Sequence, residues 1–94
     1  MSGRVEGKIA LITGGAQGLG AATARMFAQQ GARVAITDIN GDGARSIASE
    51  LNAQHPGCAI AIAHDVTDEE QWRRAVGETG SAFGGLHVLV NNAG

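Results

Sequence analysis

A glycine-rich turn, set between an apolar run and a helical pattern, limits most strongly what this chain can fold into. The turn spans Thr13–Gly20 and follows the apolar run Lys8–Thr13. A helix is expected to begin at Gly18 and to continue to about Gln30. Short, continuous apolar runs are typical of strands that are covered on both faces, as in parallel sheets. The segment therefore predicts a strand–turn–helix unit.

The same alternation of strand and helix continues along the chain. Further apolar runs predict strands at Arg33–Thr37, Cys58–Ala63 and Leu86–Val90. The order βαβαβαβ implies right-handed crossovers and a parallel sheet. We expect an α/β fold of the Rossmann type, a doubly wound parallel sheet truncated to strand order 3-2-1-4. Residues 1–94 would then form a single, incomplete domain, the N-terminal dinucleotide-binding part of such a fold.

Helical periodicity predicts which faces of the helices are buried. The expected stripes are Leu19, Ala22, Thr23, Met26 and Phe27 in the first helix, Ala44, Ile47, Ala48 and Leu51 in the second, and Trp72, Val76, Thr79 and Phe83 in the third. Thr67, with Glu70 three residues later, predicts a capping box that opens the third helix. Gly31 and Gly84 are expected to end the first and third helices.

Composition excludes several classes of protein. Apolar residues make up 44% of the chain but aromatic residues only 3%, so the core must consist of Ala, Val, Ile and Leu. A net charge of −2 argues against nucleic acid and anionic membranes as partners. No apolar run approaches the roughly 18 residues of a membrane-spanning helix. Cys58 is the single cysteine, which fits a reducing cytoplasm, and the three histidines share no metal-ligand spacing.

The glycine turn has the chemistry of a diphosphate site. Ligands of doubly wound sheets bind at the carboxyl ends of the strands, where the strand order reverses. A diphosphate there needs backbone N–H groups at close range and a helix N-terminus, here between Gly14 and Gly20. Gly14 lets the chain leave the strand sharply, Gly18 sits where a Cβ would crowd the ligand, and Gly20 lets the helix pack closely. The alternative is a purely structural glycine-rich turn.

Asp38 ends the second predicted strand, 18 residues after Gly20. A carboxylate there can accept hydrogen bonds from both hydroxyls of an adenosine ribose, and it repels a 2′-phosphate. A site that recognises a 2′-phosphate needs a positively charged side chain nearby, but Gln17, Ile39 and Asn40 are uncharged. The sequence therefore favours NAD over NADP as the cofactor. The alternative is a solvated aspartate that opens the following loop.

Polar residues also follow the third and fourth predicted strands. The Asp65 carboxylate and the Val66 backbone N–H could read an adenine edge. Alternatively, Asp65 is a turn residue ahead of the helix cap at Thr67. Asn91 and Asn92 can bond to the backbone of the neighbouring strand end, and Ala93–Gly94 leaves room for a ribose. A structural Asx turn is the alternative for the asparagines.

Together these motifs resemble the N-terminal part of the short-chain dehydrogenase/reductase family. The matching segments are Thr13-Gly14-x-x-x-Gly18-x-Gly20, the strand-end Asp38, Asp65-Val66 and Asn91–Gly94, and the match runs from about Gly7 to Gly94. The resemblance implies an NAD site lined by Gly14, Gln17, Gly18, Leu19, Asp38, Ile39, Asp65, Val66, Asn92, Ala93 and Gly94. It also implies a parent oxidoreductase that transfers hydride between NAD(H) and an alcohol or ketone, its small-molecule substrate.

One departure from the family pattern concerns catalysis. The family's serine, tyrosine and lysine normally come after the Asn-Asn-Ala-Gly turn. This sequence contains no tyrosine, and its one lysine is Lys8, before the first strand. We therefore expect no catalytic residue within the chain and no turnover by the chain alone. A non-catalytic nucleotide-binding or self-assembling half-Rossmann scaffold is the alternative. An exposed fourth strand also predicts a homo-oligomer.

Overall fold

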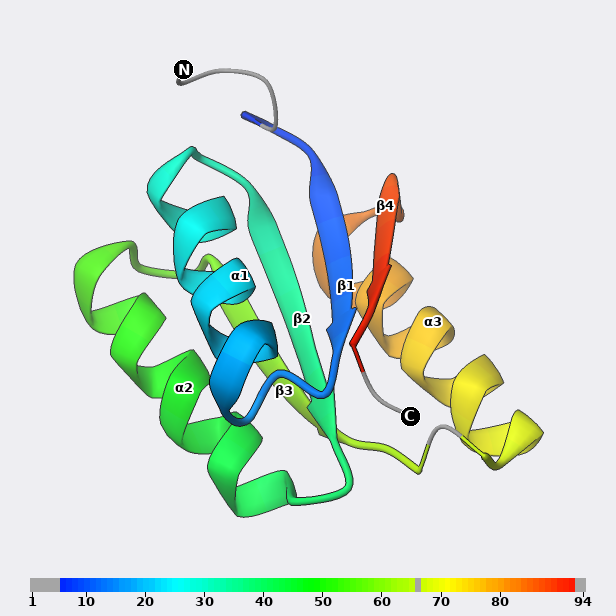
Figure 1. Cartoon of the computed structure of the whole chain (residues 1–94). Coiled ribbons are helices and arrows are strands. Elements are labelled where there is room, and N and C mark those ends of the chain that lie inside the picture. The colour runs from blue at the N-terminus through cyan, green and yellow to red at the C-terminus, as the bar shows by residue number, and fades with distance from the viewer. Residues whose placement is uncertain (1–5, 66, 93–94) are drawn as a thin grey trace.

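In a computed structural model, which describes residues 6–65 and 67–92, strands and helices alternate along the chain (Figure 1). The strands are β1 (Ile9–Thr13), β2 (Arg33–Asp38), β3 (Ala59–Ala63) and β4 (Val88–Asn91). The helices are α1 (Gly18–Gln29), α2 (Gly41–Gln54) and α3 (Glu69–Phe83). This is the predicted βαβαβαβ order, with boundaries that differ from the prediction by a few residues.

The strands form one parallel sheet in the order β3-β2-β1-β4, which confirms the predicted α/β fold and its strand order. Thr13, the last residue of β1, stands in register with Thr37 of β2 and with Asn91 of β4. The carboxyl ends of three neighbouring strands are therefore level with one another. Side chains and loops that follow these strands meet at one edge of the sheet.

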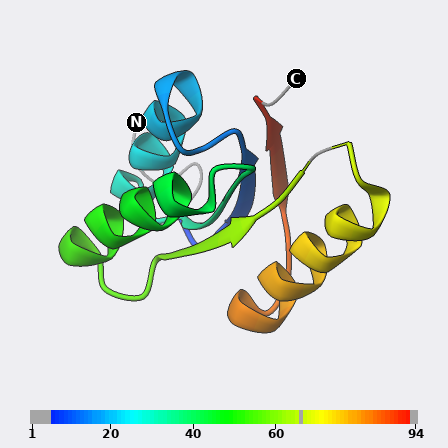
Figure 2. The same ribbon diagram turned by 90° about the horizontal axis from the view of Figure 1, so that it is seen from below.

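The helices cover the two faces of the sheet unequally. Helices α1 and α2 lie on one face and α3 lies on the other (Figure 2). Within β1, Ala10 and Ile12 belong to the core under α1 and α2, and Leu11 belongs to the core that includes Ala75 of α3. The buried side chains of both cores are mostly Ala, Ile, Leu and Val, as the composition predicts. The sheet thus holds the carboxyl ends of its strands between two packed layers.

The predicted buried face of α1 is wrong. Leu19 is 74% exposed and Met26 is 47% exposed. Phe27 of the predicted stripe does pack partly against the core. The buried residues are the small ones, Gly20, Ala21, Ala24 and Ala28. Small side chains let a helix axis approach the sheet closely, and the larger side chains at the start of α1 then point away from it. For α2 the predicted face is confirmed, since Ala44, Ile47, Ala48 and Leu51 are all buried.

The predicted start of α3 is also wrong. The helix begins at Glu69, and its N-cap is Asp68, whose Oδ1 accepts hydrogen bonds from the amides of Glu70 at 2.9 Å and Gln71 at 3.2 Å. Thr67 instead donates both its amide and its hydroxyl to Asp65 Oδ1. Thr67, which was predicted to cap the helix, is therefore hydrogen-bonded to the Asp65 carboxylate instead. At the other end, Gly84 caps α3 with a φ of 91°, as predicted.

Helix α3 buries a narrower face than its periodicity predicts. Thr79 is buried as expected, and Ala75, outside the predicted stripe, is fully buried as well. Val76 is 43% exposed, which contradicts its predicted place in the core. Trp72 is half-buried and packs against the smaller of the two cores.

Candidate functional site

A cleft of about 430 Å³ is lined by residues from the carboxyl end of the sheet and from the N-terminus of α1. The structure brings more than half of the predicted site residues together around it: Gly14, Gln17, Gly18, Leu19, Gly20, Asp38 and Asn92. These residues come from the turn after β1, the end of β2 and the segment after β4. Because this edge belongs to neighbouring parallel strands, residues far apart in the sequence share one cleft.

The glycine turn depends on its glycines for two different reasons. Gly14 and Gly18 have φ angles of 63° and 60°, a left-handed backbone that other residues adopt at a cost. At Gly20 the reason is contact, because a Cβ there would lie 2.0 Å from the carbonyl oxygen of Gly14. A Cβ at Gly18 would meet no protein atom within 4 Å, so the space above it is open. The turn thus presents bare backbone to the cleft.

Two amides of the turn are used within the protein. The amide of Gly15 donates to the carbonyl oxygen of Thr37 at 3.0 Å, and the amide of Ala16 donates to Asp38 Oδ2 at 3.1 Å. The amides in the first turn of a helix have no intrahelical acceptor. In α1 these belong to Gly18, Leu19 and Gly20, and no acidic side chain lies in that turn. An anion at this helix end would meet donors without a competing negative charge.

Asp38 is held in a fixed orientation at the end of β2. Besides accepting from Ala16, its carboxylate accepts a hydrogen bond from the amide of Asn40 through Oδ1 at 2.9 Å. Asp38 itself is half-buried and lines the cleft, and Ile39 beside it is 75% exposed. A carboxylate oxygen has more than one lone pair, so both oxygens can still accept a further donor.

Asp65 stands apart from this cleft, after the end of β3. Its Oδ1 accepts hydrogen bonds from the Thr67 amide at 2.9 Å and the Thr67 hydroxyl at 2.7 Å. These hydrogen bonds lower the pKa of the Asp65 carboxyl below its usual value. Its amide donates to Gln71 Oε1 of α3 at 2.8 Å. Asp65 therefore has the hydrogen bonds of a turn residue. Val66, Ala93 and Gly94, which were predicted site residues, lie outside the described part of the chain.

Thr13 organises the segment after β4, a role that sequence reasoning did not assign to it. Its buried hydroxyl donates to Asn91 Oδ1 at 2.8 Å and accepts a hydrogen bond from the Asn92 amide at 3.0 Å. The asparagines were predicted to bond with the backbone of the neighbouring strand end, but in these two hydrogen bonds the partner is the side chain of Thr13. A threonine as the last residue of an apolar strand, directly before the glycines, is the signal that could have indicated this.

His64 is a second residue whose role sequence reasoning missed. It is 2% exposed, and its Nδ1 lies 3.2 Å from the hydroxyl of Thr37. Its ring meets the Trp72 ring edge to face, with centroids 4.6 Å apart. Its Nε2 is buried without a hydrogen-bond partner. Burial lowers the pKa of His64, because the charged imidazolium loses its hydration there.

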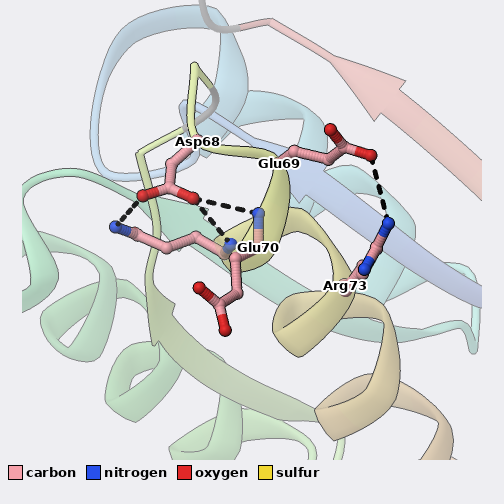
Figure 3. A network of polar contacts seen from close by, with 5 residues as sticks. Asp68, Glu69, Glu70 and Arg73 are labelled. Atoms are coloured by element: carbon pink, nitrogen blue, oxygen red, sulfur yellow. Dashed lines mark hydrogen bonds and ion pairs between the residues drawn. The ribbon is translucent and has the colours of Figure 1, made fainter.

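A second hollow, of about 600 Å³, lies over the first turns of α3. It is lined by Asp68, Glu70, Gln71, Arg73 and Arg74. The Asp68 carboxylate is occupied by the cap of the helix, and Arg73 pairs with Glu69 at 3.3 Å (Figure 3). The side chains that line this hollow are exposed or half-exposed. The hollow therefore lacks the buried, hydrogen-bonded framework that surrounds the cleft beside Asp38.

Residues 6–65 and 67–92 contain neither a cluster of metal-binding side chains nor a helix suited to crossing a membrane. Among them, no three His, Cys, Asp or Glu side chains come together as metal ligands would. None of the helices in these ranges combines the length and the apolar character that crossing a membrane requires.

Comparison with known sequences gives one consistent result. Residues 8–94 match the sequence profile of the short chain dehydrogenase family. The whole chain is 49% identical to 2,5-dichloro-2,5-cyclohexadiene-1,4-diol dehydrogenase of Sphingobium indicum, of which it covers 37%. It is 47% identical to 3-alpha-(or 20-beta)-hydroxysteroid dehydrogenase of Mycobacterium tuberculosis, of which it covers 35%. The chain thus spans little more than a third of the length of these relatives.

Solved structures agree with the sequences. One similar structure is 3-ketoacyl-(acyl-carrier-protein) reductase from Brucella melitensis in complex with NADH. It has a TM-score of 0.89 and 42% identity over 96% of this chain, or 36% of that chain. Another is the apo form of glucose dehydrogenase of Caenorhabditis elegans. It has a TM-score of 0.90 and 34% identity over 98% of this chain, or 40% of that one.

Proposed function

This chain belongs to the short chain dehydrogenase family, and from that premise we propose that it is the NAD-binding portion of an oxidoreductase that acts on an alcohol or ketone. The observation that carries the proposal is the cleft in which the glycine turn and Asp38 face the same space. Residues 1–94 would then be one incomplete domain of a longer enzyme, since the chain spans 37% of one relative.

The described residues fit the adenosine diphosphate half of NAD. The first-turn amides of α1 suit a diphosphate, and the open space above Gly18 leaves room for it. The Asp38 carboxylate suits the two hydroxyls of a ribose. Asp65 and Val66 are the residues that we assign to adenine. Asn92 would line the same cleft, and Ala93 with Gly94 would leave room for a ribose.

Asp38 also supports NAD over NADP. A 2′-phosphate would approach a carboxylate that two backbone amides hold in place, so the negative charge cannot easily turn away. The neighbouring Ile39 offers no positive charge to a phosphate. The similar structure with bound NADH, at 42% identity, is consistent with this choice.

When bound, the nicotinamide would supply the hydride acceptor or donor, and this chain would bind and orient the cofactor. Moving the accompanying proton needs a general acid or base near the reacting oxygen. The family resemblance assigns that task to a tyrosine and a lysine, and this chain has no tyrosine. We therefore propose that the 94 residues alone turn over no substrate. Sustained NADH production from NAD and a panel of secondary alcohols would contradict this.

Calorimetric titration tests the binding proposal directly. We expect NAD to bind the chain weakly, because the described cleft serves only part of the cofactor, and NADP to bind roughly tenfold more weakly than NAD, a difference of about 1.4 kcal/mol. Equal affinities, or tighter binding of NADP, would refute the assignment of Asp38. No binding of either nucleotide would instead favour the scaffold interpretation.

We also propose that the isolated chain self-associates through β4 and works in the cytoplasm. β4 is the last strand in the order of the described sheet, and its Leu89 is 54% exposed. An unpaired strand edge with an apolar side chain favours pairing with a second copy. Sedimentation at micromolar concentration is expected to show a dimer, and a clean monomer would count against this proposal.

A further inference from the structure

Gly43, in the first turn of α2, packs against Ala16 of the glycine turn. This glycine was not among the predicted site residues and does not line the cleft. A Cβ placed on it would lie 2.9 Å from the Cβ of Ala16 in the glycine turn. Real Cβ atoms do not approach other carbon atoms so closely, so the side chain of Ala16 occupies the space that a larger residue at position 43 would need.

Hydrogen bonds join the same residues into a closed circuit. Asp38 accepts from the Ala16 amide at 3.1 Å with one carboxylate oxygen and from the Asn40 amide at 2.9 Å with the other. Asn40 is the N-cap of α2, and its Oδ1 accepts from the Gly43 amide at 3.0 Å. The packing of Ala16 on Gly43 closes the circuit. The end of β2, the start of α2 and the glycine turn thus hold one another in place.

From this circuit we infer that Gly43 is a positioning residue of the nucleotide site. This inference rests on the proposed function. The bare Cα of Gly43 lets Ala16 sit deep enough for its amide to reach Asp38. That contact fixes the spacing between the Asp38 carboxylate and the first turn of α1. The Asp38 carboxylate serves the ribose and the first turn of α1 serves the diphosphate of the same ligand. A change in the distance between these two groups therefore weakens both contacts together.

A methyl group at position 43 leaves few ways to relax. It would also lie 2.7 Å from Asn40 Nδ2, which is the end of a flexible side chain. Asn40 can turn away only by giving up the hydrogen bond that its Oδ1 accepts from the Gly43 amide. The Cβ of Ala16 is fixed to the backbone of the turn, so relief on that side moves the turn itself. The Ala16 amide then moves away from Asp38.

The test is a methyl swap between the two positions. We compare Gly43→Ala, Ala16→Gly and the double variant Ala16→Gly/Gly43→Ala by calorimetric titration with NAD. Gly43→Ala is expected to weaken NAD binding roughly tenfold, a change of about 1.4 kcal/mol. The double variant lacks the Ala16 methyl that the new methyl group at position 43 would meet, but it keeps the close approach to Asn40 Nδ2. Measured against Ala16→Gly, it is therefore expected to lose clearly less NAD affinity than Gly43→Ala loses against the parent. Gly77→Ala makes the same change in α3, where a Cβ meets nothing within 4 Å, and should leave binding unchanged.

A second readout does not need the nucleotide. Hydrogen exchange of the Ala16 amide reports its hydrogen bond to Asp38. Gly43→Ala should speed this exchange and the double variant should restore protection, even if the parent chain binds no NAD and the proposed function fails. Unchanged exchange and NAD affinity in Gly43→Ala would overturn the inference. So would an equal loss of both in the Ala16→Gly background. If Gly43→Ala does not fold, recovery of the fold in the double variant supports the contact, and failure to recover overturns it.

Discussion

The amide of Ala16 donates a hydrogen bond to Asp38 Oδ2 at 3.1 Å, which ties the glycine turn to the end of the neighbouring strand. The sequence predicts that amides between Gly14 and Gly20 face a diphosphate. In the structure, the amides of Gly15 and Ala16 serve the fold of the turn itself. The amides left for a diphosphate are those at the start of α1. The turn is therefore shaped before any ligand arrives, which reduces the ordering that binding requires.

Asp38→Asn is expected to weaken NAD binding and to narrow the preference for NAD over NADP. The substitution keeps the shape of the side chain but removes its charge and one acceptor. Hydrogen bonds to charged groups contribute about 1.5–3 kcal/mol, so the affinity for NAD should fall at least tenfold. The affinity for NADP should fall less, because repulsion of the 2′-phosphate disappears. Calorimetric titration with both nucleotides measures the two changes.

Asp42→Asn is the matched control for this prediction. Asp42 is an exposed residue in the first turn of α2, where it pairs with Arg45. The same change of charge there should leave both affinities as they were. A ratio of NAD to NADP affinities that Asp38→Asn does not alter would show that the carboxylate plays no part in the choice of cofactor.

Gly20→Ala is expected to destabilise the fold. Its Cβ would meet the carbonyl oxygen of Gly14 at 2.0 Å, and both atoms belong to the backbone or are fixed to it, so only movement of α1 or of the turn relieves the clash. Overpacking of this kind costs about 1–3 kcal/mol, and occasionally more. Urea unfolding gives the change in the free energy of unfolding. Gly77→Ala, in the interior of α3, should instead stabilise the chain by up to about 1 kcal/mol through helix propensity. If the two variants behaved alike, close packing at Gly20 would not explain the glycine.

Thr13→Val is expected to loosen the segment after β4. Valine fills the same buried volume but cannot bond with Asn91 Oδ1 or the Asn92 amide. Loss of such partners costs about 1–3 kcal/mol where the groups left behind are poorly hydrated. Thermal unfolding measures the loss. Thr23→Val is the control, because the Thr23 hydroxyl bonds to the Leu19 carbonyl at an exposed site on α1. An equal effect of the two substitutions would mean that Thr13 has no special role.

The sheet could be predicted because its signals are local. Each strand is a short apolar run, and each strand end carries a glycine, an aspartate or an asparagine. Parallel pairing then brings these ends together without further information. This is why Gly14, Gly18, Asp38 and Asn92 could be predicted to lie at one edge of the sheet, where they do line one cleft.

The errors arise where neighbouring groups compete. Hydrophobicity favours Leu19 and Met26 for the buried face of α1, but close approach of the helix to the sheet favours Ala21 and Ala24, and packing prevails. Thr67 and Asp68 are both acceptable helix caps, and Asp65 decides between them by binding Thr67. The hydrogen bond between Ala16 and Asp38 joins residues 22 positions apart and depends on the close packing at Gly43, which no local pattern reveals.

The chain is expected to lose stability as the pH falls through the range in which histidine titrates, and His64 should account for part of the loss. Burial lowers the pKa of His64 in the folded chain, and Arg74 lowers it further, while Asp65 and Asp68 oppose the shift. The unfolded chain therefore binds a proton at a higher pH than the folded chain does. The stability that the neutral ring contributes is complete above the unfolded pKa, near 6.5, and is lost as the pH falls from there through the lowered folded value.

Urea unfolding of the parent and of His64→Gln at several pH values between 5 and 8 measures this effect. One additional proton taken up on unfolding changes the free energy of unfolding by at most about 1.4 kcal/mol per pH unit. The difference between the two stability curves, parent minus His64→Gln, isolates the contribution of His64. The Asp65 carboxyl titrates below this range, because its pKa is lowered. Parallel stability curves for the two proteins would show that His64 titrates alike in the folded and unfolded chains, contrary to its burial between Thr37 and Trp72.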